Sequence, residues 1–363
     1  MMVLVKFILR FPHTQTWLNR DRVILLLALF VYAAVYEVTY LWPNLLGLSG
    51  AKVGVFESQT LDMDVSGNKF WNDHYKKHGF DTTAASTMTS INSSENEVDI
   101  MHSAKTATCK GFFTVWPSDC VDKYNDLNMR LKVLSVQMDL MNTTLTVYVT
   151  DTKMCEFQHK SILIEKFHRT ELLTEYGFQS TFAIMDTWPK DRFTRISDIL
   201  RLALASKYFK TYIDMDVTFL RLQKHLYEKS FVGAAIWQNA KNAIELTNGA
   251  FCLPQNVLAD MMGYQRERIL RGNSMYFYTE LGPSMFHNVL MNRHEIVMYS
   301  HNNPAEASLD EIASGIHQYG HMHLHLTGHV RKGNNDLNFG EIVNTIRAKA
   351  GLPTLPYPTG VEE

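Results

Sequence analysis

RISDILRLALASKYFKTYIDMDV, which fills residues 195–217, joins a helical pattern to a strand that ends in two carboxylates. Ile199 and Leu202 lie at helical spacing, and Ser197 has a side chain typical of a helix N-cap. These features predict a helix over Asp198 to Lys207. The apolar residues that follow are strand-like, so this segment has the order of a helix feeding a sheet.

The strand predicted over Thr211 to Val217 carries Asp214 and Asp216 two residues apart. Side chains two apart on a strand point to one side, and the carboxyl-terminal edge of an open α/β sheet is where ligands bind. Two carboxylates there suit one hard divalent cation such as Mg²⁺ or Mn²⁺, and these ions bridge to phosphates. The pattern therefore predicts a metal site in an enzyme whose substrate is a nucleotide diphosphate sugar.

The tetrapeptide Asp214-Met215-Asp216-Val217 occurs a second time, as Asp62-Met63-Asp64-Val65. This second copy lies in a polar stretch with no helical pattern before it. A D-x-D tripeptide by itself is more often a solvated turn than a metal site. The copy at Asp214 differs because it follows an apolar strand. Its context, and not the tripeptide alone, indicates a function.

The positions around Asp214 resemble the D-x-D sugar-binding segment of the α-1,4-galactosyltransferases and their α-1,6-mannosyltransferase relatives, a family 32-like group of glycosyltransferases. The matching positions are Arg195, Ser197, Asp198, Arg201, Lys207, Tyr208, Tyr212, Asp214 and Asp216. Three later segments resemble the same family: Thr247-Asn248-Gly249-Ala250-Phe251, Leu281-Gly282-Pro283 and His325-Leu326. Together the matches cover roughly residues 140 to 330.

One departure from the family concerns the turn before the strand. Where the family has two glycines, this chain has Phe209-Lys210. A turn that usually exploits the positive φ of glycine must then be built from another residue. Loss of turnover is one interpretation, in which the chain is a catalytically inactive, membrane-tethered protein of the same fold that binds a sugar nucleotide or carbohydrate.

The resemblance implies an α/β fold of the GT-A nucleotide-diphospho-sugar transferase kind, a Rossmann-like mixed sheet flanked by helices. It also implies a retaining transferase that moves a hexose from UDP-galactose, UDP-N-acetylglucosamine or GDP-mannose to a hydroxyl of a glycan, glycolipid or glycoprotein. Asp214 and Asp216 would hold the Mn²⁺ or Mg²⁺ ion, with His325 as a third ligand or as a contact to the diphosphate, and His323 fits the histidine position nearly as well.

The residues expected to contact the donor are Asp198, Arg201, Tyr212, Asn248 and Gly249. Asp198 and Arg201 share one helix face, where they orient the donor or form an intrahelical ion pair. Asn248 offers an amide to sugar hydroxyls beside Gly249, or only begins a strand. Glu280 is a candidate catalytic carboxylate on the acceptor side, or an acidic residue that precedes a helix.

Elsewhere the chain alternates strand-like and helical segments, which favours an α/β domain. Further strands are predicted over Leu145 to Val149, Thr181 to Ile184, Phe231 to Ile236 and Gly249 to Leu253. Further helices are predicted over Asp122 to Gln137 and Gln255 to Leu270.

The N-terminal region predicts a membrane anchor. VILLLALFVYAAVYEVTYLW, residues 23–42, is long enough at about 1.5 Å per residue to span roughly 30 Å of hydrocarbon. The basic residues of segment 1–22 keep that tail in the cytosol, which predicts a single-pass type II protein of the Golgi membrane, or of the ER, with a lumenal catalytic domain. Because Glu37 interrupts the run, a cleaved signal peptide is the alternative.

The rest of the chain divides by composition. Residues 43–105 include a Ser/Thr/Asn-rich run and are interpreted as a stem, residues 106–350 as the catalytic domain and residues 351–363 as a tail. A chain of 363 residues with 46% hydrophobic residues and a net charge of −2 suits one globular domain behind the anchor. Because no Lys/Arg-rich patch with interleaved aromatics occurs, no nucleic-acid partner is predicted.

Cysteines and sequons suit an exported protein. The four cysteines allow up to two disulfides, whose pairing the sequence leaves open: Cys109, Cys120, Cys155 and Cys252. A buried free thiol is the alternative, above all for Cys252. Asn92 and Asn142 begin N-glycosylation sequons.

A late histidine cluster raises a second metal hypothesis. His321, His323 and His325 would share one face of a strand, as three zinc ligands do. No acidic residue or cysteine lies close by in sequence, and histidines on a strand are more often polar-face residues. A zinc hydrolase is therefore a rival interpretation, one that would keep its activity without Asp216.

Overall fold

The computed structural model describes residues 76–77, 109–116, 127–150, 157–188, 193–237, 243–272, 280–303, 306, 308–326 and 337–357. All of them lie in the unit Thr60–Glu363. Outside them lie the predicted tail 1–22, the anchor 23–42, nearly all of the stem, and Asn92, Cys120 and Cys155. Within the described ranges, no helix combines the length and the apolar character needed to cross a bilayer.

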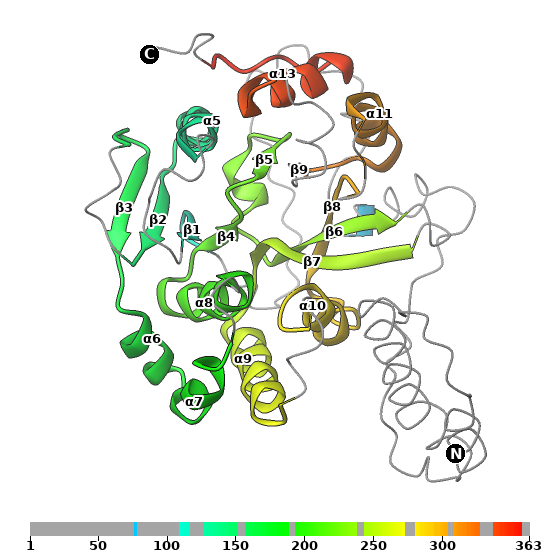
Figure 1. The fold of residues 1–363 in the computed structure, drawn as a ribbon. Helices are drawn as coiled ribbons and strands as arrows, with labels where there is room; N and C mark the ends of the chain where they lie inside the picture. Colours follow the sequence, from blue (N-terminus) through cyan, green and yellow to red (C-terminus); the bar gives the residue numbers. More distant parts are fainter. Residues whose placement is uncertain are drawn as a thin grey trace, which may run out of the picture. The chain divides into compact units, whose positions relative to one another are not determined.

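In the described part of the chain, seven strands form a mixed sheet in the order β3-β2-β1-β4-β7-β6-β8 (Figure 1). Only β7 runs antiparallel to its neighbours, and the remaining strands share one direction. The bounds are Phe112–Trp116 (β1), Leu145–Val149 (β2), Ile162–Lys166 (β3), Thr211–Ile213 (β4), Phe231–Trp237 (β6), Ala243–Cys252 (β7) and Val297–His301 (β8). The predicted α/β class with a mixed sheet is confirmed.

A second, two-stranded sheet pairs β5 (Val217–Phe219) with β9 (His323–His325) in antiparallel orientation. The register places Val217 opposite His325. This small sheet therefore joins the segment that follows the two aspartates to the late histidines, although the two lie far apart in sequence.

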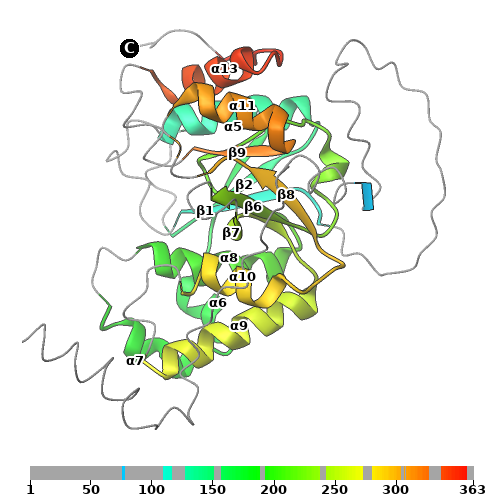
Figure 2. The same ribbon diagram turned by 90° about the vertical axis from the view of Figure 1, so that its right-hand side faces the viewer.

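Helices cover the large sheet on both faces (Figure 2). On one side lie α6 (Arg169–Glu175), α7 (Phe182–Met185), α8 (Phe193–Tyr208), α9 (Gln255–Leu270) and α10 (Pro283–Leu290). On the other lie α5 (Leu127–Leu140), α11 (Leu309–Tyr319) and α13 (Phe339–Lys349). Two 3₁₀ turns, η3 (Gln179–Thr181) and η4 (Lys224–Leu226), complete the described elements.

The accuracy of the predicted elements depends on how periodic each segment is. β2 and α9 match their predicted bounds residue for residue. The helix predicted from Asp122 is described from Leu127 as α5, and the strand predicted at Gly249 is the end of β7. The sequence prediction lacks β1, β3 and β8. β1 and β8 are almost fully buried, so they lack the alternation that marks a half-buried strand.

The strand predicted over Thr181 to Ile184 is wrong. The segment Gln179–Thr181 is a 3₁₀ turn, and Phe182–Met185 is helical. The hydroxyl of Thr181 donates to the carbonyl of Phe178 at 2.7 Å, a local bond that favours a turn over a strand. A short apolar run does not distinguish helix from strand by itself.

α8 and β4 also differ from their predicted bounds. α8 begins at Phe193, so Ser197 lies inside the helix and is not its N-cap. The strand predicted from Thr211 to Val217 ends at Ile213, and a turn separates it from β5. The two aspartates therefore lie in this turn and not within a continuous strand.

Phe209 occupies the turn where the resembling family has glycine. Its φ is +53°, in the left-handed region. The N–H of Phe209 donates to the carbonyl of Ala205 at 3.0 Å, and its carbonyl accepts from the N–H of Lys110 at 2.7 Å. The turn that ends α8 is thus built with a left-handed phenylalanine, a conformation that costs about 1–2 kcal/mol for a residue with a side chain.

We expect Phe209→Gly to raise the free energy of unfolding by about 0.5–1 kcal/mol, because relief of the left-handed strain exceeds the extra entropy of glycine in the unfolded chain. The midpoint of urea unfolding measures the change. Tyr208→Gly is the matched control, since Tyr208 is the last residue of α8 and glycine there should lower the midpoint. A lower midpoint for Phe209→Gly would mean that the half-exposed ring contributes more than the strain costs.

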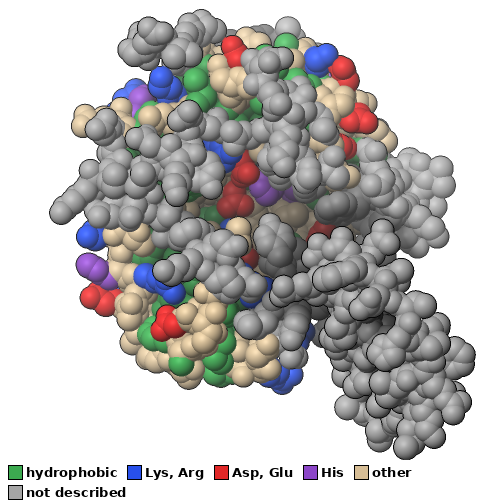
Figure 3. All heavy atoms as spheres, in the orientation of Figure 1, with side chains coloured by type: hydrophobic (Ala, Val, Ile, Leu, Met, Phe, Trp, Pro, Cys, Tyr) green, Lys and Arg blue, Asp and Glu red, His purple; other side chains and the backbone are tan. Residues whose placement is uncertain are grey.

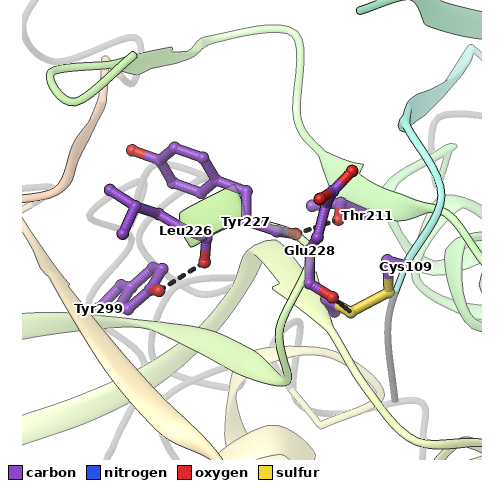
Figure 4. Close-up of a disulfide and its surroundings, with 7 residues drawn as sticks. Cys109, Thr211, Leu226, Tyr227, Glu228 and Tyr299 are labelled. Atoms are coloured by element: carbon purple, nitrogen blue, oxygen red, sulfur yellow. Dashed lines mark hydrogen bonds between the residues drawn. A yellow bond between two sulfur atoms is a disulfide. The ribbon is translucent and has the colours of Figure 1, made fainter. Parts of the chain in front are cut away.

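A disulfide between Cys109 and Cys252 joins the segment before β1 to the end of β7 (Figure 4). Cys252 is therefore not the buried free thiol considered as an alternative. Neighbouring bonds hold the segment between η4 and β6 against the same region, since the N–H of Cys109 donates to the carbonyl of Glu228 at 2.8 Å. The hydroxyl of Thr211 donates to the carbonyl of Tyr227 at 2.6 Å.

Part of the predicted tail packs onto α13. Leu355 and Tyr357 are buried and belong to one apolar cluster with Ile342 and Ile346 of that helix. The amide of Asn344 bonds to both backbone groups of Leu355, at 2.8 Å to its N–H and at 2.9 Å to its carbonyl. These residues therefore belong to the folded unit.

Candidate metal and donor site

Asp214 and Asp216 lie in the turn beyond the carboxyl end of β4. The N–H of Val217 closes this turn on the carbonyl of Asp214 at 3.0 Å, and the N–H of Asp214 donates to the carbonyl of Gly249 in β7 at 2.7 Å. Met215, between the aspartates, is 5% exposed and packs in the core. The side chains of Asp214 and Asp216, in contrast, are each 22% exposed.

His325 forms a group of three possible metal ligands with Asp214 and Asp216. β9 brings it there, and the N–H of Leu326 donates to the carbonyl of Asp216 at 2.9 Å. Its Nε2 lies 3.2 Å from Asp216 Oδ1 and 3.8 Å from Asp214 Oδ2. One ligand atom from each residue lies within 4.8 Å of the others, so all three can reach one ion. Acidic and histidine side chains lie next to each other near the middle of the face in Figure 3.

The charges of these three groups support one another. Burial opposes ionisation of Asp216, but the imidazole of His325, with help from Arg130, lowers the pKa of that carboxyl below its usual value. Burial also opposes the imidazolium, yet the carboxylates of Asp216 and Asp214 raise the pKa of His325. A proton on His325 thus offsets carboxylate charge, and a bound cation would replace that proton because a ligating imidazole is neutral.

Arg201 of α8 links the three ligands to another carboxylate, Asp198. Its Nη2 lies 3.2 Å from Asp198 Oδ1, and its Nη1 lies 3.4 Å from Asp214 Oδ2. Nη1 also donates to the carbonyl of Asn248 at 2.7 Å, and the Asn248 amide donates to Asp198 Oδ1 at 2.7 Å. The intrahelical ion pair considered as an alternative is present, but it is one part of a network that reaches Asp214.

Tyr212 completes this network. Its hydroxyl donates to Asp214 Oδ1, and the guanidinium of Arg201 lies 4.7 Å from the centroid of its ring. Burial raises the pKa of Tyr212 well above 10, so the hydroxyl remains a donor. Burial raises the pKa of Asp198 to about 6, although Arg201 opposes the shift. Asp198 therefore changes protonation near the physiological range.

Two glycines provide the space in which these groups meet. A Cβ on Gly249 would lie 2.8 Å from Cε1 of His325. A Cβ on Gly282 would lie 2.6 Å from Nδ2 of Asn248 and 2.8 Å from Oδ2 of Asp198. The absence of a side chain at Gly249 therefore leaves room for the imidazole of the candidate ligand His325.

Glu280 forms an ion pair with Arg268, in which Nε and Oε1 are 3.4 Å apart and the carboxylate side chain is 13% exposed. Burial raises the pKa of Glu280, while Arg268 and Arg195 oppose the shift. Among the described residues, no ion pair or hydrogen bond joins Glu280 to Arg201 or to the two carboxylates that Arg201 contacts. Its role toward an acceptor stays a prediction.

The other two histidines of the late cluster have separate partners. His321 Nδ1 lies 2.7 Å from the hydroxyl of Ser300, and the ring of His323 lies 5.0 Å from that of His301. Across the described residues, the one group with metal-ligand spacing is the two aspartates with His325. The hypothesis of a zinc site built from three histidines is therefore not supported there.

We expect His321→Gln to make the protein less sensitive to acid. Burial lowers the pKa of His321 to about 3, from an ordinary value of 6.5. Below about pH 6.5 the unfolded chain therefore binds a proton at His321 that the folded protein does not bind. The free energy of unfolding is highest above the pKa of His321 in the unfolded chain and falls as the pH drops below it. Between about pH 7.5 and about pH 5 the wild type should lose about 2 kcal/mol more than the variant. Urea unfolding at the two pH values measures this difference, and equal losses would contradict it.

Asn302 is a site residue that the sequence prediction lacks. It is 0% exposed, follows β8, and hydrogen-bonds through its amide to the backbone of His325. No motif marks it, because its partner is close only in the folded chain. Its sequence neighbours, His301 and Asn303, are polar, but nothing in the sequence shows that Asn302 is buried.

Among solved structures, the chain is similar to one described as "PaToxG Glycosyltransferase", with a TM-score of 0.38 and 14% sequence identity over 69% of this chain and 82% of that chain. No protein-family model and no curated protein matches the sequence. A structural likeness this distant carries no functional argument. The case for function therefore rests on the geometry of the site.

Proposed function

We propose that this protein is a retaining glycosyltransferase of the GT-A kind, which moves a hexose from a nucleotide-diphosphate sugar to a glycan hydroxyl of a glycolipid or glycoprotein. UDP-galactose, UDP-N-acetylglucosamine and GDP-mannose are the candidate donors. The observation that carries the proposal is the meeting of Asp214, Asp216 and His325 beside the Arg201 network. These groups come from the turn after β4, from β9 and from α8.

The position of the group in the sheet supports a ligand site. The chain runs outward from β1 to β2 and β3, then returns to place β4 on the other side of β1. Asp214 follows the carboxyl end of β4 at this reversal. Open α/β sheets bind ligands in the crevice outside the strand ends at such a point.

The donor atoms fit a divalent cation of the proposed kind. The carboxylate oxygens of Asp214 and Asp216 suit Mn²⁺ and Mg²⁺, and the imidazole of His325 is a ligand type more usual for transition metals than for Mg²⁺. Bound at this site, the cation supplies a Lewis acid for the negative charge that develops on a leaving diphosphate.

The chain's own residues would bind and orient the donor. The guanidinium of Arg201 lies between Asp198 and Asp214, where it would hold both carboxylates in position for the donor. Asp198 and Asn248 present a carboxylate and an amide held 2.7 Å apart, which suits recognition of sugar hydroxyls. We assign Glu280 to the acceptor side of the same site.

We further propose a lumenal location behind a type II anchor at 23–42, in the Golgi membrane or the ER. The disulfide between Cys109 and Cys252 supports it, because such bonds form and persist in oxidising compartments. The proposed acceptors, glycolipids and glycoproteins, are present at the same membrane.

A lumenal domain should receive an N-glycan at Asn142. This residue is exposed in the turn between α5 and β2 and begins the sequon Asn142-Thr143-Thr144. We expect the full chain from a eukaryotic secretory host to shift on a gel after glycosidase treatment, and Asn142→Gln to remove one such shift. Asn92→Gln is the matched control for the other sequon. A full chain without any glycan would contradict the lumenal orientation.

The proposed function is tested by donor cleavage. The full chain, purified in detergent from a secretory host, is given a panel of sugar nucleotides with mixed glycan acceptors, and release of nucleoside diphosphate is measured with Mn²⁺ and with EDTA. We expect release from one donor, abolished by EDTA. Release that survives EDTA would overturn the metal-dependent proposal.

The inactive binding protein is the second candidate, favoured by the left-handed Phe209 at the family's glycine turn. It predicts that calorimetry detects Mn²⁺-dependent binding of one donor while no acceptor gives turnover. A zinc hydrolase predicts activity that Asp216→Ala leaves intact. The two measurements together separate all three functions.

A further inference from the structure

Given the metal-dependent function, on which this inference rests, we propose that Asn302 is the positioning residue that fixes His325 as the third metal ligand. The side-chain Oδ1 of Asn302 accepts from the N–H of His325 at 2.7 Å. Its Nδ2 donates to the carbonyl of His325 at 3.1 Å. One buried amide thus bonds both backbone groups of one residue, as a neighbouring strand would.

The opposite side of His325 is held by the small sheet. β9 pairs with β5 in a register that places His325 opposite Val217. The next N–H, of Leu326, donates to the carbonyl of Asp216 at 2.9 Å. The backbone of His325 is therefore clamped between Asn302 and the turn that carries the other two ligands.

The ring of His325 has close neighbours in β7 and in the turn after β4. It lies against Gly249, where a Cβ would come within 2.8 Å of Cε1 and 3.0 Å of Nδ1. From there Nε2 faces Asp216 Oδ1 at 3.2 Å. A shift of the backbone of His325 would therefore change the distance from Nε2 to the carboxylates.

The fold also fixes Asn302 itself. It follows the carboxyl end of β8, which lies at the same edge of the sheet as the end of β4 because the two strands share a direction. Its carbonyl lies 2.8 Å from Nδ1 of His301, and it is 0% exposed. Asn302 acts on the metal only through His325 and touches none of the reacting groups in this assignment.

The test measures binding of Mn²⁺ alone to the full chain. The readout is the decrease of the free Mn²⁺ signal in electron paramagnetic resonance. We expect Asn302→Ala to weaken Mn²⁺ binding about tenfold, the usual lower effect of removing a group that orients a ligand. Asn344→Ala is the matched control. Asn344 makes the same pair of amide bonds to the backbone of Leu355, so its loss should destabilise the protein without changing Mn²⁺ affinity.

A double variant distinguishes positioning from general damage. If Asn302 acts through the imidazole, Asn302→Ala should have no further effect on Mn²⁺ affinity in a protein that already carries His325→Ala. A second tenfold loss in the double variant would show that Asn302 acts in another way and would overturn the proposal. Should Asn302→Ala fail to fold, Asn302→Thr, which keeps at most one of the two bonds, is expected to show a partial loss.

The outcomes separate this inference from the proposed function. Wild-type Mn²⁺ affinity in Asn302→Ala would overturn the role of Asn302 while leaving the metal site intact. A wild-type protein that binds no Mn²⁺, or whose binding survives Asp216→Ala, would overturn the proposed function and the inference with it.

Discussion

Asp216→Asn is expected to lower metal-dependent donor cleavage by at least about 10³-fold and to leave the fold intact. The substitution keeps the size of the side chain and removes one of two carboxylates from the ligand group. Stabilisation of charge by a cation and by fixed polar groups is commonly worth several kcal/mol at a leaving group, and about 4 kcal/mol corresponds to a 10³-fold change in rate. The loss should therefore appear in turnover and in Mn²⁺ binding together.

The local structure explains why the fold should survive this change. The backbone of the turn is held by bonds that do not involve the Asp216 carboxylate, namely Val217 N–H to the Asp214 carbonyl at 3.0 Å and Leu326 N–H to the Asp216 carbonyl at 2.9 Å. Removal of the carboxylate also removes a group that raises the pKa of His325, so that pKa should fall in the variant. NMR titration of the imidazole measures this shift independently of activity.

The chain contains its own control for this experiment. Asp64 is the residue that corresponds to Asp216 in the second copy of the tetrapeptide, Asp62-Met63-Asp64-Val65. Asp64→Asn should leave turnover and Mn²⁺ binding unchanged. Full activity in Asp216→Asn, or an equal loss in Asp64→Asn, would contradict the assignment of the metal site to the turn after β4.

Residues close together in sequence were the part of the site that the sequence could predict. Asp198, Arg201, Tyr212 and Asp214 occur within one helix–strand unit, and the structure brings all four into one network. The family resemblance singled out the first three of these, and helical periodicity with the end of an apolar strand placed them near Asp214, because the backbone between them is short and regular. The candidate metal ligand His325 also came from the family resemblance, since its partner strand β5 is distant in sequence.

The remaining features depend on contacts that no local pattern records. Asn302 is defined by one partner in β9, and Gly249 by the imidazole that lies against it. The Cys109 to Cys252 pairing joins the two ends of a 143-residue separation, and the sequence left it open. Phe209 shows the opposite case, in which the sequence identified an unusual turn but tertiary contacts decided its conformation.

Removal of the disulfide is expected to destabilise the protein by about 4 kcal/mol. Cys109 and Cys252 are 143 residues apart, so the bond closes a long loop and strongly restricts the unfolded chain. Cys109→Ala with Cys252→Ala is the appropriate variant, because changing one cysteine alone would leave a buried free thiol. Urea unfolding of the two proteins measures the difference in the free energy of unfolding.

Reductant provides the control, because Cys120 and Cys155 are also present in the chain. Reduction should lower the stability of the wild type by about the amount that the double alanine variant loses, and should change the variant little. A large further loss on reduction of the variant would assign part of the effect to the other two cysteines. Equal stability of the wild type and the variant under oxidising conditions would contradict the pairing.

The same bond connects stability to the site. Cys252 ends β7, the strand that also carries Asn248 and Gly249, and Cys109 precedes β1 in the middle of the sheet. Loss of the bond should therefore loosen the strand against which Arg201 and His325 pack, and Mn²⁺ affinity should fall along with stability. A protein made in a reducing compartment would lose both properties at once, which makes an oxidising compartment a physical requirement of the proposed site. Unchanged Mn²⁺ affinity in the folded double variant would show that the disulfide stabilises the sheet without supporting the metal ligands.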